Sequence, residues 1–183
     1  MKNPADSAQQ QILAQWLARE AELRQRASGS GIIPPELLAQ RPGIELMQGI
    51  IDGTQPVPPI ARSLDFMLVE VEHGRAVFQG TPKFDFYNPI GSVHGGWIAT
   101  LLDSCVGCAV HSALPAGKGY TTLELKVNYV RALSKNSGPV RAEGKLIHAG
   151  GRVATAEGRI TDPSGRLYAH CSTTCLILDL AKA

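Results

Sequence analysis

A single aspartate, Asp103, interrupts a long apolar stretch of the chain and is flanked by Leu101-Leu102 and Cys105-Val106. The pattern predicts a helix in which Asp103 lies about two turns from the start, too far inside to act as an N-cap. Burying an unpaired carboxylate is costly, so a chain that keeps one there has a use for it. Two uses remain open: a general base or nucleophile in a catalytic site, or a structural partner for a lysine, an arginine or a backbone amide.

Small residues accompany Asp103 at helical spacing. Four residues that are three or four positions apart form one stripe on the predicted helix: Gly96, Thr100, Asp103 and Gly107. Such a stripe leaves room for a close neighbour, which is either a ligand or a tightly packed sheet. The glycines alone do not decide between these interpretations, and the carboxylate favours the ligand.

The predicted helix begins at two glycines, Gly95 and Gly96, which follow His94. The N–H groups of a first helical turn have no intrahelical acceptor, and the absence of Cβ lets a substrate approach them. Together with the positive end of the helix dipole, they could polarise a carbonyl whose oxygen gains negative charge. His94 could either bind substrate or fix the loop, and we favour the loop role.

The elements that must position these residues follow from hydrophobic patterning. The helix over 93–114 is apolar nearly all the way round, which predicts that it is buried. Alternating patterns bounded by turn residues predict strands on both sides of it, over residues 60–72, 75–80, 120–133, 138–148, 152–161 and 166–178. One buried helix followed by a run of antiparallel strands predicts an α+β domain in which the sheet curls around the helix.

The beginning of the chain has a different pattern. Apolar residues recur every three or four positions over 5–27, which predicts an amphipathic helix, and a second helix is predicted from Pro34-Pro35 to Ile51. The proline-rich segment 52–59 cannot continue a helix and is interpreted as a linker. We therefore predict two parts: an N-terminal helical extension, residues 1–55, and a main domain, residues 56–180.

The composition is that of an ordinary globular protein. Of 183 residues, 44% are hydrophobic and 19% are charged, and the formal net charge is +2. These values argue against wholesale disorder and give no indication of a nucleic-acid-binding surface. The N-terminus lacks the apolar segment of a signal peptide, and the longest apolar run, 97–110, is too short to cross a bilayer. We expect a cytoplasmic protein with no membrane segment.

Four cysteines raise the question of a metal site. Cys105 and Cys108 form a Cys-x-x-Cys motif three residues before His111, but they lie inside the apolar helix, away from the N-terminus that would activate a redox pair. Cys171 and Cys175 share one face of a predicted strand and are interpreted as small core residues. A structural zinc is the less favoured alternative, because spacing alone does not assemble four converging ligands. We expect no metal and no cofactor.

The segment Asn88-Pro-Ile-Gly-Ser-Val-His-Gly-Gly96, followed by Asp103, resembles the signature of the PaaI-type branch of hotdog-fold acyl-CoA thioesterases, in the 4-hydroxybenzoyl-CoA thioesterase-like superfamily. The resemblance extends through Tyr120 to Tyr129, Ala156-Glu-Gly158 and Ala169 to Thr174, and so covers about residues 57–178. A bare His-Gly-Gly would be a weak signal. The whole set in this order implies the hotdog fold and hydrolysis of an acyl-CoA thioester.

The resemblance also implies residue roles. In that family the position of Asp103 supplies the general base or nucleophile, and the Gly95 amide polarises the thioester carbonyl. Asn88 matches an asparagine that helps to position the attacking water or the substrate, and Thr122 matches a Ser/Thr position that can hold the water beside the aspartate. Relatives form homodimers, usually paired into homotetramers, whose long helices lie together inside a continuous sheet. The site would then be shared, with Asn88 and Gly95 of one subunit facing Asp103 and Thr122 of the other.

The residues that would bind coenzyme A depart from the family pattern. Relatives often carry two adjacent basic residues in the segment that reads His148-Ala-Gly-Gly-Arg152 here, and this chain keeps one. Other basic side chains could compensate, namely Arg131, Lys135 and Arg141. We expect substrate contacts from Gly96, Trp97, Arg131 and Arg152, whereas the sequence does not reveal the acyl group.

Two other functions remain possible from the sequence. A non-catalytic module could use the same fold to bind an acyl-CoA without turnover. A hydratase of this fold generally pairs an aspartate with a histidine, but His94 lies nine residues before Asp103. Nine helical residues rotate by about half a turn, so these two side chains would diverge if both were on the helix.

Overall fold

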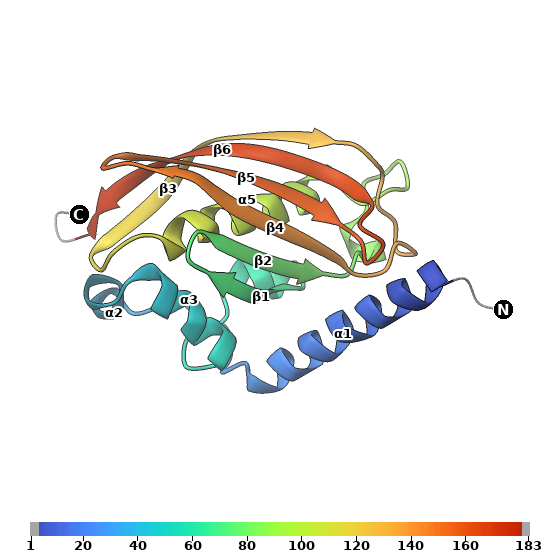
Figure 1. Ribbon diagram of the computed structural model, residues 1–183, viewed down its shortest axis with the longest axis horizontal. Coiled ribbons are helices and arrows are strands. Elements are labelled where there is room, and N and C mark those ends of the chain that lie inside the picture. The colour runs from blue at the N-terminus through green and yellow to red at the C-terminus, as the bar shows by residue number, and fades with distance from the viewer. Residues whose placement is uncertain (1–3, 181–183) are drawn as a thin grey trace.

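A computed structural model describes residues 4–180 (Figure 1). Within these residues, a six-stranded antiparallel sheet has the strand order β1-β2-β4-β5-β6-β3. The strands are β1 (Phe66–Glu72), β2 (Arg75–Gly80), β3 (Lys118–Tyr129), β4 (Val140–Ala149), β5 (Val153–Thr161) and β6 (Leu167–Asp179). The sheet arches over one long helix, α5 (Gly95–Ser112), which confirms the predicted α+β fold.

Helix α5 lies close against the sheet because glycines on the strands leave it room. A Cβ on Gly144 of β4 would overlap the carbonyl of Cys105, and one on Gly158 of β5 would lie 2.8 Å from the Val106 side chain. Ten of the helix's residues are buried. The expectation that the helix is buried on every side was wrong, however, because Gly96 is exposed and Asp103 is only half-buried. One face of α5 is therefore left uncovered by its own chain.

The two edges of the sheet differ. On the β1 edge, the Arg19 side chain donates a hydrogen bond to the main-chain carbonyl of Val69 at 3.3 Å, and helices α1, α3 and α4 contact the strand. Strand β3 is 12 residues long and pairs only with β6 among the described residues. A long edge strand of this kind offers a row of N–H and C=O groups to another strand.

The chain before the sheet forms helices α1 (Pro4–Arg26), α2 (Pro35–Gln40), α3 (Gly43–Asp52) and α4 (Pro59–Ser63). Helix α1 agrees with the amphipathic helix predicted over 5–27. The second predicted helix is in fact two, because Arg41 precedes Pro42 and takes the extended conformation that a following proline imposes. The first strand was predicted to begin too early: Pro59 starts a short helix instead, and the strand begins at Phe66.

These helices pack onto the main domain and share its core, to which α1 contributes Leu23 and α3 contributes Leu46 and Met47. Polar contacts also attach α1. The buried Gln79 side chain donates to the main-chain oxygen of Trp16 at 3.1 Å and to Glu20 at 2.8 Å. The domain division near residue 56 stays a prediction.

The cysteines are structural, as the sequence indicated. All four are free thiols; Cys105, Cys171 and Cys175 are buried, and Cys108 is half-buried. Burial raises the pKa of Cys105 well above its ordinary value and that of Cys108 to about 12. Protonated thiols are poor nucleophiles. Within residues 4–180 no cluster of three or more His, Cys, Asp or Glu side chains is arranged to hold a metal ion.

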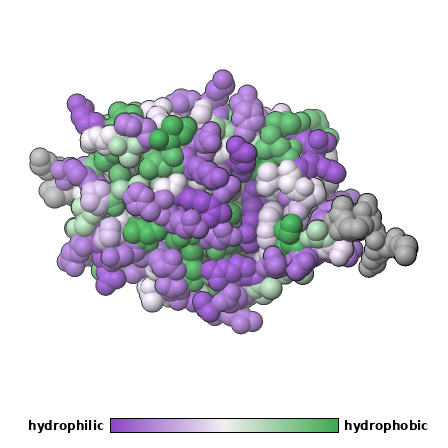
Figure 2. Space-filling model, in the orientation of Figure 1, coloured by the Kyte–Doolittle hydropathy of each residue, from purple (hydrophilic) through white to green (hydrophobic). Residues whose placement is uncertain are grey.

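The face of the molecule seen in Figure 2 carries mainly hydrophilic residues, with smaller hydrophobic areas between them. None of the helices in the described part of the chain is both long enough and apolar enough to span a membrane.

Candidate active site

Asp103 and Thr122 form the first part of the candidate site. Asp103 lies in the middle of α5, and its Oδ1 accepts a hydrogen bond from Thr122 Oγ1 at 3.0 Å. Thr122 lies at a bulge of β3, where the pairing with β6 shifts register between Thr122 and Glu124. Bulges commonly redirect a side chain at functional sites. Among residues 4–180 no lysine or arginine pairs with Asp103, so a single chain gives no support to the alternative of a structural ion pair.

Tyr120, two residues before Thr122, closes one end of the small-residue stripe. A Cβ on Gly107 would lie 2.5 Å from the Tyr120 hydroxyl oxygen. Gly107 therefore serves side-chain packing, not ligand access. Burial raises the pKa of Tyr120 well above its ordinary value, and the nearby Cys108 and Asp103 raise it further. The phenol consequently stays neutral beside the carboxylate.

His94 is the N-cap of α5, and its hydrogen bond distinguishes the Gly95 amide from the Gly96 amide. Its Nδ1 accepts a hydrogen bond from the Gly96 N–H at 2.8 Å. This contact is in line with the loop-organising role that we favoured for His94. It contradicts the expectation that the Gly96 N–H binds substrate, since that donor is already used.

Gly95 presents the amide that remains. Its N–H has no acceptor among the described residues, while its carbonyl accepts a hydrogen bond from Tyr129 Oη at 3.0 Å. A hollow of about 290 Å³ lies beside it, with Arg131 in its wall. Sequence reasoning did not single out Tyr129, although it ends the matched segment that starts at Tyr120. Gly95 thus lines this hollow, and its N–H is free to donate a hydrogen bond.

Asn88 organises the loop that precedes α5. Its Oδ1 accepts hydrogen bonds from the N–H groups of Ile90 at 3.1 Å and Ser92 at 3.3 Å, and its Nδ2 donates to Ser92 Oγ at 3.0 Å. One Nδ2 hydrogen remains for another partner. In a single chain Asn88 therefore holds the loop, and its expected contact with water or substrate stays a prediction.

Two of the predicted substrate contacts lie far apart in one chain. The Arg131 N–H donates to the Tyr168 carbonyl near the start of β6, whereas the Arg152 carbonyl accepts from Ile177 near the end of that strand. Nine strand residues span about 30 Å. Both arginine side chains are exposed, and their main chains lie beside opposite ends of β6.

Trp97 was expected to contact substrate, and Arg141 was named as a basic side chain that could compensate for the missing one. The Trp97 side chain belongs to the core, is 3% exposed, and donates its Nε1–H to the Leu64 carbonyl at 2.9 Å. Arg141 is held by Glu70 at 2.6 Å and packs over the Trp16 ring at 4.5 Å. Indole and guanidinium are thus both occupied by structural contacts.

The remaining candidates fall into two groups along α5. Gly95 and Asp103 are eight residues apart, which separates them by about 12 Å along the axis and about 80° around it. The Gly95 amide and the Asp103 carboxylate of one chain therefore do not converge on one carbonyl group. We call the surroundings of Gly95, with Asn88 and Arg131, the amide half-site, and the Asp103–Thr122 pair the carboxylate half-site.

Comparisons with known proteins agree with this fold and this site segment. Residues 90–169, which contain most of the amide half-site and all of the carboxylate half-site, match the family model "Thioesterase superfamily". The chain is also 33% identical over 110 residues to a candidate esterase of Saccharolobus solfataricus, and the match covers 60% of this chain and 76% of the relative.

Solved structures show the same fold. A candidate thioesterase from Ralstonia eutropha JMP134, described as related to phenylacetic acid degradation, is 26% identical, with a TM-score of 0.65 over 72% of this chain and 98% of that one. The Escherichia coli PaaI protein, at 19% identity, has a TM-score of 0.60 over 65% of this chain and 83% of its own. The resemblance to PaaI-type proteins is therefore confirmed, and the chain belongs to the thioesterase superfamily, with its hotdog fold.

Proposed function

We propose that this protein hydrolyses an acyl-CoA thioester to the free acid and coenzyme A, and that two copies of the chain build each active site. The observation that carries the proposal is the Asp103–Thr122 pair, with a hydrogen bond of 3.0 Å between α5 and β3 at a half-buried carboxylate. Asp103 has no cation partner in the described chain, which leaves its carboxylate available for chemistry.

The geometry supports different roles for the two oxygens of the Asp103 carboxylate. Thr122 donates to Oδ1 and so fixes the plane of the carboxylate, while Oδ2 can accept a proton from a bound water. The water oxygen then attacks the thioester carbon as its proton passes to Asp103. Collapse of the tetrahedral intermediate breaks the carbon–sulfur bond, and the departing thiolate takes up a proton. A direct attack by Asp103, through an anhydride that water later opens, is the other route open to the same carboxylate.

The carbonyl oxygen needs a donor as negative charge develops on it. The free Gly95 N–H, at the positive end of α5, can supply that donor, and a preorganised donor of this kind is worth on the order of a hundredfold or more in rate. Because Gly95 and Asp103 of one chain do not converge, the donor comes from a second copy.

A symmetric dimer through the β3 edge would bring the half-sites together. Two β3 strands paired about a two-fold axis run antiparallel, so the Tyr129 end of one strand meets the Lys118 end of the other. The amide half-site then faces the partner's carboxylate half-site. The same operation brings Arg131 toward the partner's β4–β5 turn, where Arg152 lies, and these two side chains are proposed to bind the coenzyme A phosphates.

The test is thiol release from purified protein with a panel of short, medium and aryl acyl-CoAs. Asp103→Asn should lose nearly all of the rate and remain folded, because Asn keeps the size and the hydrogen bond with Thr122. Ser104→Ala is the matched control: Ser104 is the adjacent half-buried residue on the same helix and should tolerate the change. Equal rates for wild type and Asp103→Asn would remove Asp103 from the mechanism. Binding of acyl-CoA without any thiol release would identify a non-catalytic binding module.

A further inference from the structure

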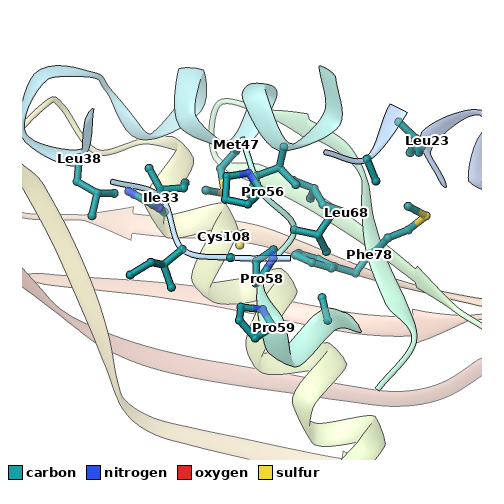
Figure 3. Close-up of a pocket in the computed structure, with 18 of the residues that line it drawn as sticks. Leu23, Ile33, Leu38, Met47, Pro56, Pro58, Pro59, Leu68, Phe78 and Cys108 are labelled. Carbon is teal, nitrogen blue, oxygen red and sulfur yellow. The ribbon is translucent and has the colours of Figure 1, made fainter. Parts of the chain in front are cut away.

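A second cavity, of about 430 Å³, lies between the N-terminal helices and the main domain. Figure 3 shows it surrounded by Ile33, Met47 and Pro56 from the N-terminal part, by Leu68 and Phe78 from the first hairpin, and by Cys108 from α5. No Asp, Glu, Lys or Arg is among the lining residues. It reaches the surface beside Ile32, a lining residue that is 77% exposed.

The cavity is too large to be a packing defect. Protein interiors contain few voids larger than a water molecule, and an engineered apolar cavity of about 150 Å³ already binds benzene. By that measure, 430 Å³ could hold an apolar chain of at most about 17 carbon atoms. Most of the wall comes from residues 23–61, which lie outside the family match over 90–169. The extension therefore creates a space that the sheet and α5 would not enclose alone.

The inner wall of the cavity adjoins the carboxylate half-site. Cys108, His111 and Tyr120 line the cavity, and Cys108 is five residues, or about 7.5 Å along the helix axis, beyond Asp103. The Tyr120 ring stands between the cavity and the carboxylate half-site. It lines the cavity, and its hydroxyl lies over Gly107, one turn after Asp103. Burial lowers the pKa of His111 and raises that of Cys108 to about 12, so this wall is uncharged at neutral pH.

We propose that this cavity binds the apolar end of the acyl group whose thioester lies at Asp103, so that the N-terminal extension sets the preferred chain length. The inference rests on the proposed thioesterase activity. About six methylene groups span the 7.5 Å of helix axis between Asp103 and Cys108 when the Tyr120 ring turns aside, and the groups beyond them enter the cavity. Medium and long acyl chains are therefore the preferred substrates. Each methylene moved from water into the cavity raises kcat/KM by up to about fourfold until the space is full.

The test fills the cavity without touching the half-sites. Ile33→Trp adds a large side chain to the lining, and Ile12→Trp makes the same change on α1 at a position that is 38% exposed and does not line the cavity. Wild type and Ile12→Trp should show kcat/KM rising with chain length along a series from butyryl-CoA to stearoyl-CoA until the cavity is full. Ile33→Trp takes up room for about two carbons, so the chain length at which kcat/KM stops rising should fall by about two carbons, while the butyryl-CoA value stays within about twofold. The retained butyryl-CoA rate shows that the variant is folded.

Ile33→Ala provides an independent second variant because it enlarges the space. It should move the preferred chain length upward by one or two carbons. Unchanged chain-length profiles in both Ile33 variants, with hydrolysis intact, would overturn the cavity assignment and leave the thioesterase proposal standing. If no acyl-CoA is hydrolysed, calorimetric titration with decanoyl-CoA tests the cavity assignment separately from the thioesterase proposal. Binding that is lost in Ile33→Trp and kept in Ile12→Trp supports the cavity, and binding equal in both variants overturns it.

Discussion

Complementation between two inactive variants is the sharpest test of a site shared between chains. Gly95→Val crowds the free amide, because even a single Cβ at this position would lie 3.2 Å from the Tyr129 ring. Tyr129 is 54% exposed and ends its strand, so it can move aside and the variant should fold. Asp103→Asn removes the proposed base. Each variant alone should lose about a hundredfold or more of kcat.

The expected recovery follows from counting intact sites. If one chain supplies Gly95 and its partner supplies Asp103, a mixed dimer contains one site with both residues intact and one with both altered. Random reassociation of equal amounts makes about half of the dimers mixed, so activity should recover to about a quarter of wild type. The assay is thiol release after joint unfolding and refolding of the two variants, with native mass spectrometry to measure the mixed dimer.

The control is each variant refolded alone, which should stay inactive. A site built within one chain predicts no recovery, since every chain then carries one defect. Mixed dimers at about half of the population with activity no higher than the controls would therefore refute the shared site.

Three further predictions concern the candidate site and its scaffold. Thr122→Val should lower kcat by about 5- to 30-fold with little change in KM, because a hydrogen bond of about 1–2 kcal/mol that orients Asp103 is lost; steady-state kinetics measure this. Burial alone would raise the pKa of Asp162, but hydrogen bonds from the β5–β6 turn lower it below its ordinary value of 3.8. A lowered pKa means stability that is present at neutral pH and lost as pH falls through that pKa, so Asp162→Asn should destabilise by about 1–2 kcal/mol at pH 7 and by much less near pH 2 in urea unfolding. Gly144→Ala should lower the melting temperature in thermal unfolding by about 6 °C or more, because its methyl group overlaps a main-chain carbonyl of α5.

Much of the fold could be predicted because hydrophobic periodicity reports the face that each element buries. The central helix and the strand pattern depend on many residues each, so single exceptions did not disturb them. The errors lie at two places where a single proline determines the local backbone conformation. Arg41 is extended because Pro42 follows it, and Pro59 opens a helical turn in a segment whose apolar residues are typical of a strand.

The candidate site was less predictable because it depends on hydrogen-bond competition. Asp103 could be singled out, since a carboxylate inside an apolar helix is anomalous in any arrangement. The Gly96 amide could not be excluded, because histidine is not among the usual N-cap residues and nothing in the sequence indicates that His94 would accept its hydrogen. Thr122 was found only through the family resemblance, as strand alternation does not show which side chain a bulge turns toward the helix.

The position of the N-terminal extension explains both the cavity and the open strand edge. Helices α1, α3 and α4 contact β1, and Arg19 hydrogen-bonds to a carbonyl of that strand, so one edge of the sheet is occupied. The edge of β3 is open to another strand among the described residues, and its ends carry Tyr129 beside Gly95 and Thr122 beside Asp103. The extension thus leaves self-association to the edge that completes the proposed active site. Lengthening the proposed acyl pocket from the β1 side would then change substrate range without disturbing the proposed subunit contact.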